Sequence, residues 1–327
     1  MFFLWMEHMS KKESLSIGGQ AVIEGVVMRG PRYIATAVRR KNNTIEIQRE
    51  ELVSVTQKNK LLGLPIIRGF VSLIEVLIIG MKTLQFSADR AELDYEETVS
   101  KDKSKKREKI ETTLTFLFAF ALAFGIFTYL PYQVAYLFKL SDGSIIFNIF
   151  TGIIRIIFFI GYVKLISYLK DVQRLFEYHG AEHKTVHAYE NGDELTVSNV
   201  DKYTTLHPRC GTSFIFLVLL TSILIFALLD AFYAFLFGTP SLFIRIGYHL
   251  LFMPLISGVS YEVLKISGKR IDTPLVKLFT TPGMLLQKIT TKPPTEDQLE
   301  VAMVSLRSAL EMPQPEGIKI EYIKSEK

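Results

Sequence analysis

A long run of residues without charge constrains the fold of this chain most. Residues 112–138 contain no charged side chain, and a helix needs roughly 20 mainly apolar residues to cross a bilayer. Three more apolar runs follow, at residues 144–163, 213–237 and 241–261. Because only helices and closed barrels satisfy their own backbone groups in lipid, the sequence predicts an α-helical multipass membrane protein with four transmembrane helices in two hairpins.

The distribution of Lys and Arg predicts the orientation of these helices. Half of the 38 lie before residue 112, whereas the two short connections, residues 139–143 and 238–240, hold a single one. Positive residues collect on the cytoplasmic side of a membrane. We therefore expect a cell-membrane protein whose N- and C-termini and long middle loop, residues 164–212, are cytoplasmic.

This reading divides the chain into seven segments. Residues 1–14 are an N-terminal lead-in whose apolar run is too short for a secretory signal, and the single cysteine excludes an internal disulfide. The others are a cytosolic β-rich domain (15–63), an interfacial or re-entrant helix with a basic linker (64–111), transmembrane hairpin 1 (112–163), a cytosolic loop with a His/Cys cluster (164–212), transmembrane hairpin 2 (213–261) and cytosolic C-terminal helices (262–327).

Local patterns predict the elements outside the membrane. Residues 15–56 alternate β-branched with polar residues and are interrupted by turn signals at Gly30 and at Asn42. Residues 64–84 are apolar but contain Arg68 and Glu75, so we expect an interfacial or re-entrant helix. Near the C-terminus, Thr295 and Gln298 predict a capping box. The final residues predict a short strand or a disordered tail.

The basic run at residues 101–109 has two interpretations. It fits an orientation signal that contacts anionic membrane lipids. It also fits a contact with RNA or the ribosome, since phosphate attracts such a run without sequence specificity. No RNA-binding motif accompanies the run, so we expect no sequence-specific binding of nucleic acid.

The polar loop contains the chain's strongest chemical signal. His179, His183 and His187 stand four residues apart, and they extend an apolar seam that the helix period traces through Leu165 and Leu169. This seam predicts that the second transmembrane helix continues into the cytoplasm without a break.

Within this run, His179, Glu182 and His183 form an H-x-x-E-H pattern. Histidines at positions i and i+4 of a helix can bind one ion, and the glutamate can activate a water molecule beside it. His207 and Cys210 follow at the start of the third apolar run, and imidazole with thiolate is a zinc-like ligand set. We predict a zinc or similar divalent ion with His179, His183, His207 and Cys210 as ligands and Glu182 as the catalytic base.

Simpler interpretations of the same residues remain open. Gly180 weakens a helix, histidines near a membrane surface can serve as polar packing, and Cys210 can be a small buried residue. A bound ion can also be purely structural.

Long motifs resemble a known family. SIGGQAVIEGVVMRGP, FEYHGAEHKTVHAYENG, HPRCGTSF and EDQLEVAM are similar to the YqhQ-like family of bacterial membrane proteins, whose function is unknown and which is described as a predicted metal-dependent enzyme. The resemblance covers residues 15–312. Its motif residues are Gly18, Gly19, Gln20, Glu24, Gly25, Arg29, Gly30, Pro31, His179, Glu182, His183, His207, Arg209 and Cys210.

The glycine-rich segment at residues 18–30 lacks the spacing of a phosphate-binding loop. We expect its glycines to lie where a strand passes close to another backbone. Glu24, Arg29, His187 and Arg209 are accessory candidates for the site, with Glu24 as a further metal ligand.

Polar residues inside the apolar runs should find partners because an isolated charge in lipid is unfavourable. We expect Arg155 to pair with Asp230, and Arg245 to extend to the outer membrane surface. The alternative is a polar path for an ion or a substrate.

Three functions follow from these patterns. The first is a metal-dependent hydrolase that acts at the membrane surface. The second is a non-catalytic scaffold or membrane-protein biogenesis factor that contacts the translocon or ribosome. The third is a small transporter or channel, which four helices would form most readily as an oligomer.

Overall fold

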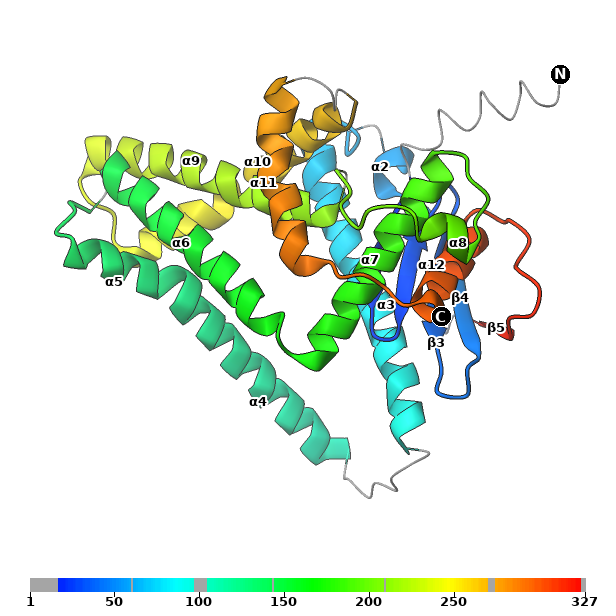
Figure 1. Cartoon of the computed structure of the whole chain (residues 1–327). Coiled ribbons are helices and arrows are strands. Elements are labelled where there is room, and N and C mark those ends of the chain that lie inside the picture. The colour runs from blue at the N-terminus through cyan, green and yellow to red at the C-terminus, as the bar shows by residue number, and fades with distance from the viewer. Residues whose placement is uncertain are drawn as a thin grey trace.

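A computed structural model describes residues 17–59, 61–96, 105–142, 144–208, 210–269 and 274–324. It divides into two regions, a set of long apolar helices and a compact region around a β-sheet (Figure 1). The lead-in, residues 101–104 of the basic run and Arg209 lie outside the described residues.

The sheet begins with a meander close to the N-terminus. Strands β1 (Gly18–Val22), β2 (Gly25–Arg29), β3 (Tyr33–Arg39) and β4 (Ile45–Glu51) pair antiparallel in chain order. The predicted turns at Gly30 and Asn42 are confirmed, and Asn43 has a positive φ of 68°. The C-terminal tail supplies β5 (Ile320–Ile323), which pairs parallel to β4.

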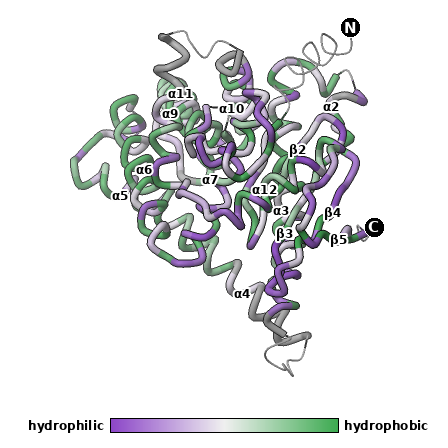
Figure 2. Tube along the Cα trace, turned by 45° about the vertical axis from the view of Figure 1, so that its right-hand side comes forward, coloured by the Kyte–Doolittle hydropathy of each residue, from purple (hydrophilic) through white to green (hydrophobic). Residues whose placement is uncertain are grey.

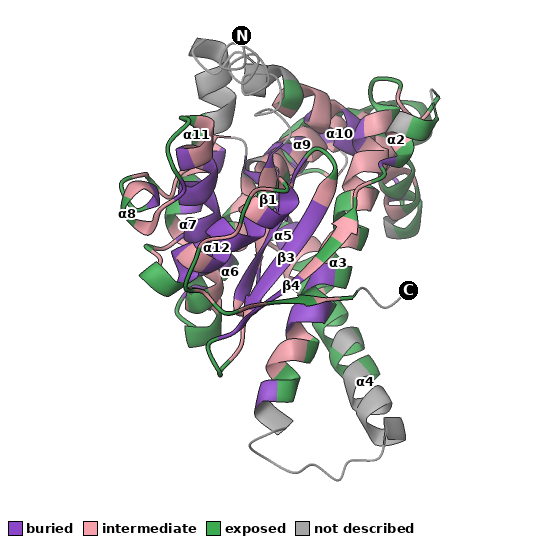
Figure 3. Ribbon diagram, turned by 90° about the vertical axis from the view of Figure 1, so that its right-hand side faces the viewer, coloured by how far each residue is buried: buried purple, intermediate pink, exposed green. Residues whose placement is uncertain are grey.

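Alternation along the strands produces two packed faces, because successive side chains point to opposite sides of a sheet. On one face, Met28 and Ile47 pack with residues of α7 (Lys170–Glu190) and α12 (Glu296–Ala309). On the other face, Val27 and Val38 pack with Phe86 of α3 (Ile67–Glu96). We call this unit (β1 to β5, α7, α12 and the C-terminal half of α3) the α/β lobe, and its buried interior is visible in Figure 3.

Helix α12 closes the lobe, and its start agrees with the sequence. The predicted capping box between Thr295 and Gln298 is present. The hydroxyl of Ser305, within the helix, donates to the carbonyl of Ala35 on β3 at 2.9 Å. The N-terminal strands therefore share one core with helices that come much later in the chain.

Four helical segments are long and apolar enough to cross a membrane, at Thr113–Leu137, Ile145–Ile166, Phe214–Phe237 and Phe243–Lys265. They agree with the four predicted runs. We call them the apolar helices, and Figure 2 shows the hydrophobic colour along α5, α6 and α9. Their elements are α4 (Lys105–Phe124), a π-helical turn η2 (Gly125–Tyr129), α5 (Leu130–Leu137), α6 (Ile145–Ile166), α9 (Gly211–Phe237) and α10 (Leu242–Lys269).

Helix α3 connects the two regions. It is longer than the predicted residues 64–84, and its two expected interruptions are both paired. Arg68 forms an ion pair with Glu262 of α10 at 2.5 Å, and Glu75 accepts a hydrogen bond from the backbone N–H of Val55 at 2.6 Å. Val55 begins the short helix α2 (Val55–Lys58).

The prediction of an unbroken helix from the second apolar run into the loop is wrong. Helix α6 ends at Ile166, α7 begins at Lys170, and the chain turns sharply between them (Figure 1). Leu169 caps α7 with extended backbone angles and is 58% exposed. The apolar spacing continues across the break, but the seam does not form one packed face.

Two of the described helices remain, α8 (Val197–Val200) on the lobe and α11 (Pro274–Thr290) on the apolar helices. Helix α8 follows α7, and α11 packs against α9 and α6. The loop before α9 and the end of α11 both approach α7. The histidine-bearing helix therefore lies where the apolar helices meet the lobe.

Candidate metal centre

Helix α7 presents the predicted residues on adjacent turns. Gly180 lets another segment approach the helix closely, because a Cβ at this position would lie 2.1 Å from the carbonyl oxygen of Lys292. The N–H of Lys292 donates to the carbonyl of Phe176 at 2.9 Å. Gly180 is therefore needed for a close backbone contact that holds the segment after α11 against α7.

Three of the predicted ligands form a first cluster. Ligand atoms of His179, His183 and Cys210 all lie within 4.8 Å of one another. Nε2 of His179 is 3.2 Å from Sγ of Cys210. A tetrahedral zinc site places its nitrogen and sulfur ligands about 3.5 Å apart, so small movements would complete such a site.

The tautomers of both histidines favour metal binding. Nδ1 of His179 bonds to the carbonyl of Thr290 at 2.8 Å, and Nδ1 of His183 bonds to the carbonyl of Thr205 at 2.5 Å. Because a carbonyl oxygen only accepts, both Nδ1 atoms carry the proton in the neutral ring. Each Nε2 therefore directs a lone pair into the cluster, as in metal sites whose histidines are oriented by outer carbonyls.

His183 gives the most direct indication of a missing partner. The residue is 1% exposed; its Nε2 makes no hydrogen bond of ordinary geometry, and its closest side-chain interaction is with the thiol of Cys210. The nearest charged atom is a carboxylate oxygen of Glu182 at 3.4 Å. A buried nitrogen with a free lone pair is unfavourable unless something binds it, and a metal ion fits this position.

Cys210 completes the cluster from another element. It caps the N-terminus of α9, where the helix dipole favours negative charge. Thr212 donates to its sulfur through the hydroxyl at 3.2 Å. The thiol is therefore held by the helix that begins directly after it.

Glu182 is buried beside both histidines. Burial raises the pKa of its carboxyl above the ordinary value, and neighbouring histidines and the N–H of Gly19 counteract this rise. A Cβ on Gly19 would lie 2.9 Å from Cγ of Glu182 and 2.3 Å from the carbonyl oxygen of Val27. The prediction of a glycine at a close backbone approach is thus confirmed for Gly19.

His207 lies in a second cluster. Ligand atoms of His187, Glu190 and His207 lie within 4.8 Å of one another. The backbone of His207 is held by the side-chain amide of Gln287, which accepts from its N–H and donates to its carbonyl, both at 2.8 Å. Burial lowers the pKa of His183 and of His207 below the ordinary value.

The sequence interpretation missed Glu190 and the residues that orient the histidines. Glu190 stands three residues after His187, a spacing that could have identified it. Gln287, Thr205 and Thr290 gave no such signal because their contacts join separate elements.

Two of the accessory candidates, Glu24 and Arg29, lie outside both clusters. Glu24 forms an ion pair with Arg174 and accepts from the hydroxyl of Tyr178 at 3.3 Å. It occupies the turn between β1 and β2, with a φ of 52°, and belongs to neither cluster. Arg29 ends β2 opposite Gly18 and also belongs to neither cluster.

Charges within the apolar helices pair differently from the prediction. Asp230 pairs with Arg245 at 3.2 Å and with His249 at 2.8 Å. Arg245 is 3% exposed and also pairs with Asp142, so it does not extend to the surface. The guanidinium of Arg155 lies over the ring of Tyr132, 5.1 Å from its centroid.

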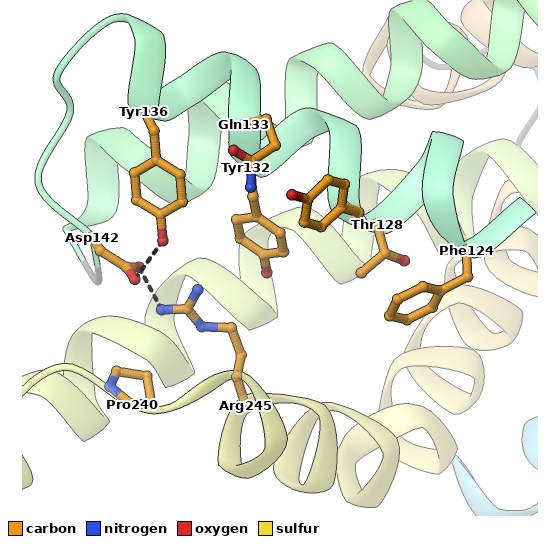
Figure 4. A pocket seen from close by; sticks show the side chains of 9 residues that line it. Phe124, Thr128, Tyr132, Gln133, Tyr136, Asp142, Pro240 and Arg245 are labelled. Carbon is orange, nitrogen blue, oxygen red and sulfur yellow. Dashed lines mark hydrogen bonds and ion pairs between the residues drawn. The ribbon is translucent and has the colours of Figure 1, made fainter. Parts of the chain in front are cut away.

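A cavity of about 170 Å³ adjoins Arg245. Figure 4 shows Tyr136, Asp142 and Arg245 joined by hydrogen bonds at its rim. Phe124, Thr128 and Tyr129 line it from η2 and the end of α4. The π-helical turn η2 therefore forms part of one wall of this cavity.

Comparison with known proteins identifies the family. The chain belongs to the family described as "Protein of unknown function (DUF1385)", whose model matches residues 64–312. It is 32% identical over 304 residues to "Uncharacterized protein YqhQ" of Bacillus subtilis, covering 90% of this chain and 92% of that protein. The predicted resemblance is thus confirmed. No solved structure matches the chain.

Proposed function

We propose that this chain is a metal-binding multipass membrane protein whose His179, His183 and Cys210 hold zinc or a similar divalent ion. We propose further that it acts as a metal-dependent hydrolase at the cytoplasmic surface of the cell membrane. The observation that carries the proposal is the buried Nε2 of His183, which has no hydrogen bond of ordinary geometry and lies within 4.8 Å of ligand atoms of His179 and Cys210.

The ligand count supports catalysis. Catalytic zinc sites have three protein ligands and one open position, whereas structural sites have four. An ion there supplies Lewis acidity that makes a water molecule nucleophilic near neutral pH. Glu182 is placed to accept the proton of that water, because its carboxylate is 3.4 Å from Nε2 of His183. Its raised pKa brings the carboxyl closer to the pKa range useful for general acid–base catalysis.

Exposed apolar side chains support placing the four helices in a membrane. Phe120, Phe235 and Phe243 are 74%, 84% and 85% exposed, and soluble proteins rarely expose apolar patches of this extent. With the Lys and Arg distribution, this favours a cytoplasmic His/Cys cluster and cytoplasmic termini. Alkaline phosphatase, which is active only outside the cytoplasm, should be active when fused after Thr239 and inactive when fused after Asp193.

Metal content tests the first part of the proposal. Full-length protein purified in detergent without chelator should contain at least one ion per chain by mass spectrometry. His183→Gln and Cys210→Ser should each remove an ion, while Glu194→Gln, an exposed glutamate beyond the end of α7, should change nothing. A wild-type protein without metal would refute the proposal.

Catalysis is tested separately through Glu182→Gln. This variant should retain the ion of the first cluster and lose hydrolysis of lipid or peptide substrates that the wild-type protein cleaves. Retained metal with unchanged hydrolysis would contradict the role of Glu182.

A non-catalytic membrane factor is the competing function. The bonds from His179 and His183 to Thr290 and Thr205 join α7 to α11 and to the loop before α9, so an ion there would also fasten the lobe to the apolar helices. In that case Glu182→Gln would have no effect in cells. Co-purification with a translocon or ribosome would then identify the partner of the basic run at residues 101–109.

A further inference from the structure

The second cluster lies directly beside the first. The ring centroids of His183 and His207 are 5.6 Å apart, and those of His187 and His207 are 4.6 Å apart. His179, His183, His187 and Glu190 follow one another along one face of α7 at spacings of four, four and three residues. A single helix face therefore contributes ligands to both clusters.

His187 is also oriented by a bond to a backbone carbonyl, but through Nε2, whereas His179 and His183 bond through Nδ1. Its Nε2 bonds to the carbonyl of Leu206 at 2.8 Å. A carbonyl only accepts, so Nε2 carries the proton of the neutral ring and Nδ1 keeps the lone pair. The three histidines of α7 are thus all fixed by backbone carbonyls, which is the usual outer arrangement of metal-ligating imidazoles.

His207 and Glu190 provide the other ligand atoms of this cluster. Nε2 of His207 makes a hydrogen bond of 3.4 Å with a carboxylate oxygen of Glu190, and an ion bound between the two groups would replace this bond. His207 is 5% exposed, and the amide of Gln287, itself 0% exposed, fixes its backbone. A rigid, buried histidine facing a carboxylate and a second imidazole is a typical set of ligands for a divalent transition metal.

We propose that His187, Glu190 and His207 bind a second divalent metal ion, so that the centre holds two neighbouring ions. This inference rests on the proposed function, because the two ions occupy neighbouring positions on α7. The second set contains two nitrogens and one oxygen and no sulfur. It suits Zn²⁺, Mn²⁺ or Fe²⁺, whereas the thiolate of the first set favours zinc.

Glu182 supports a joint centre. Its carboxylate is buried and lies 3.4 Å from Nε2 of His183 in the first cluster, and the ring of His183 is 5.6 Å from that of His207 in the second. Paired metal ions commonly stabilise the attacking and the leaving oxygen of a displacement reaction together. Such a centre suits hydrolysis of a phosphate ester at the membrane surface.

Cobalt distinguishes the two sites because only one contains sulfur. Chelator-treated, full-length protein in detergent should bind two equivalents of Co²⁺, and only one should produce a thiolate-to-cobalt charge-transfer band. Glu190→Gln should halve the stoichiometry and keep the full band. Cys210→Ser should remove the band and keep one equivalent. The control Glu194→Gln should behave as the wild type.

The outcomes separate this inference from the proposed function. The second site would be overturned, and the first left intact, if the wild-type protein bound one equivalent of Co²⁺ with the full charge-transfer band. The Glu190→Gln variant would then behave in the same way. Absence of cobalt binding would overturn both. The charge-transfer band in Glu190→Gln also reports that the variant is folded.

Discussion

The α/β lobe and the apolar helices use the same kinds of side chain in opposite ways. In the lobe, Tyr178, Ile45 and Leu306 are at most 1% exposed. In the apolar helices, Phe235 is 84% exposed, and only scattered positions face another helix. The lobe hides apolar area from water, whereas the helices present it to their surroundings. The difference indicates that contacts within the protein determine the structure of the lobe, whereas most of the apolar helices' surface is left for contacts outside the described chain.

The substitution with the largest expected effect on stability removes a buried charge within the apolar helices. Arg245→Met removes the arginine partner of Asp230, which is 0% exposed. Asp230 keeps its contacts with His249 and Tyr248, but breaking a buried pair costs about 3–5 kcal/mol. Arg155→Met is the control, since Arg155 is half-buried and loses a cation–π contact worth about 0.5–1 kcal/mol. Unfolding in detergent measures both, and equal losses would show that the Asp230 pair does not stabilise the bundle.

Truncating a large apolar side chain should lower the stability of the protein when the side chain lies in the lobe but not when it lies on the outside of the apolar helices. Leu306→Ala, at a position 0% exposed, should lower the free energy of unfolding by about 2–5 kcal/mol. Phe235→Ala should stay within about 0.5 kcal/mol in detergent. A comparable loss for Phe235→Ala would indicate that another protein surface covers it.

The glycines of α7 and α6 give a matched pair of helical positions. Gly180→Ala would place a methyl group against the carbonyl of Lys292 and should cost about 1–3 kcal/mol. A Cβ on Gly161 meets no atom within 4 Å, so Gly161→Ala should be neutral or stabilise by up to about 1 kcal/mol. Thermal unfolding compares the two, and a neutral Gly180→Ala would contradict the close approach.

Acid should destabilise the metal-free lobe, by less than the substitutions above. Burial lowers the pKa of His183 and His207. As the pH falls through the ordinary value of 6.5, the unfolded chain takes up protons that the native histidines do not, so stability falls. Unfolding of chelator-treated protein at high and low pH measures this loss, and His183→Gln should reduce it.

Glu182 acts in the opposite direction. Its raised pKa means that the native state takes up a proton at a higher pH than the unfolded chain, so acid stabilises the native state through this group. Glu182→Gln should therefore make the acid-induced loss steeper. A shallower loss would place the Glu182 carboxyl in a more polar environment.

Local patterns in the sequence predicted much of both regions. The four apolar helices follow from long apolar runs, the meander from alternation and turns, and the start of α12 from its capping box. The break between α6 and α7 was missed because the apolar spacing of Leu165, Leu169 and Val172 continues across it. Periodicity records which residues would share a face but not whether the helix is continuous.

Contacts between distant segments could not be predicted in this way. Nothing near Arg245 in the chain identifies Asp142 as its partner, and nothing near His207 identifies Gln287. The site was predicted best where its residues share one helix, as His179, Glu182 and His183 do. The assignment of His207 to a second cluster depended on how a loop packs against α7.

The bond between Ser305 and Ala35 joins residues 270 positions apart. At 5–20 residues per second, a ribosome needs on the order of tens of seconds to make the intervening chain. During this time β2 and β3 have been synthesised, but the helix that covers them has not. The apolar helices are also synthesised within this interval. The order of synthesis therefore makes α12 one of the last parts of the lobe's core to form, after the first four strands and the apolar helices.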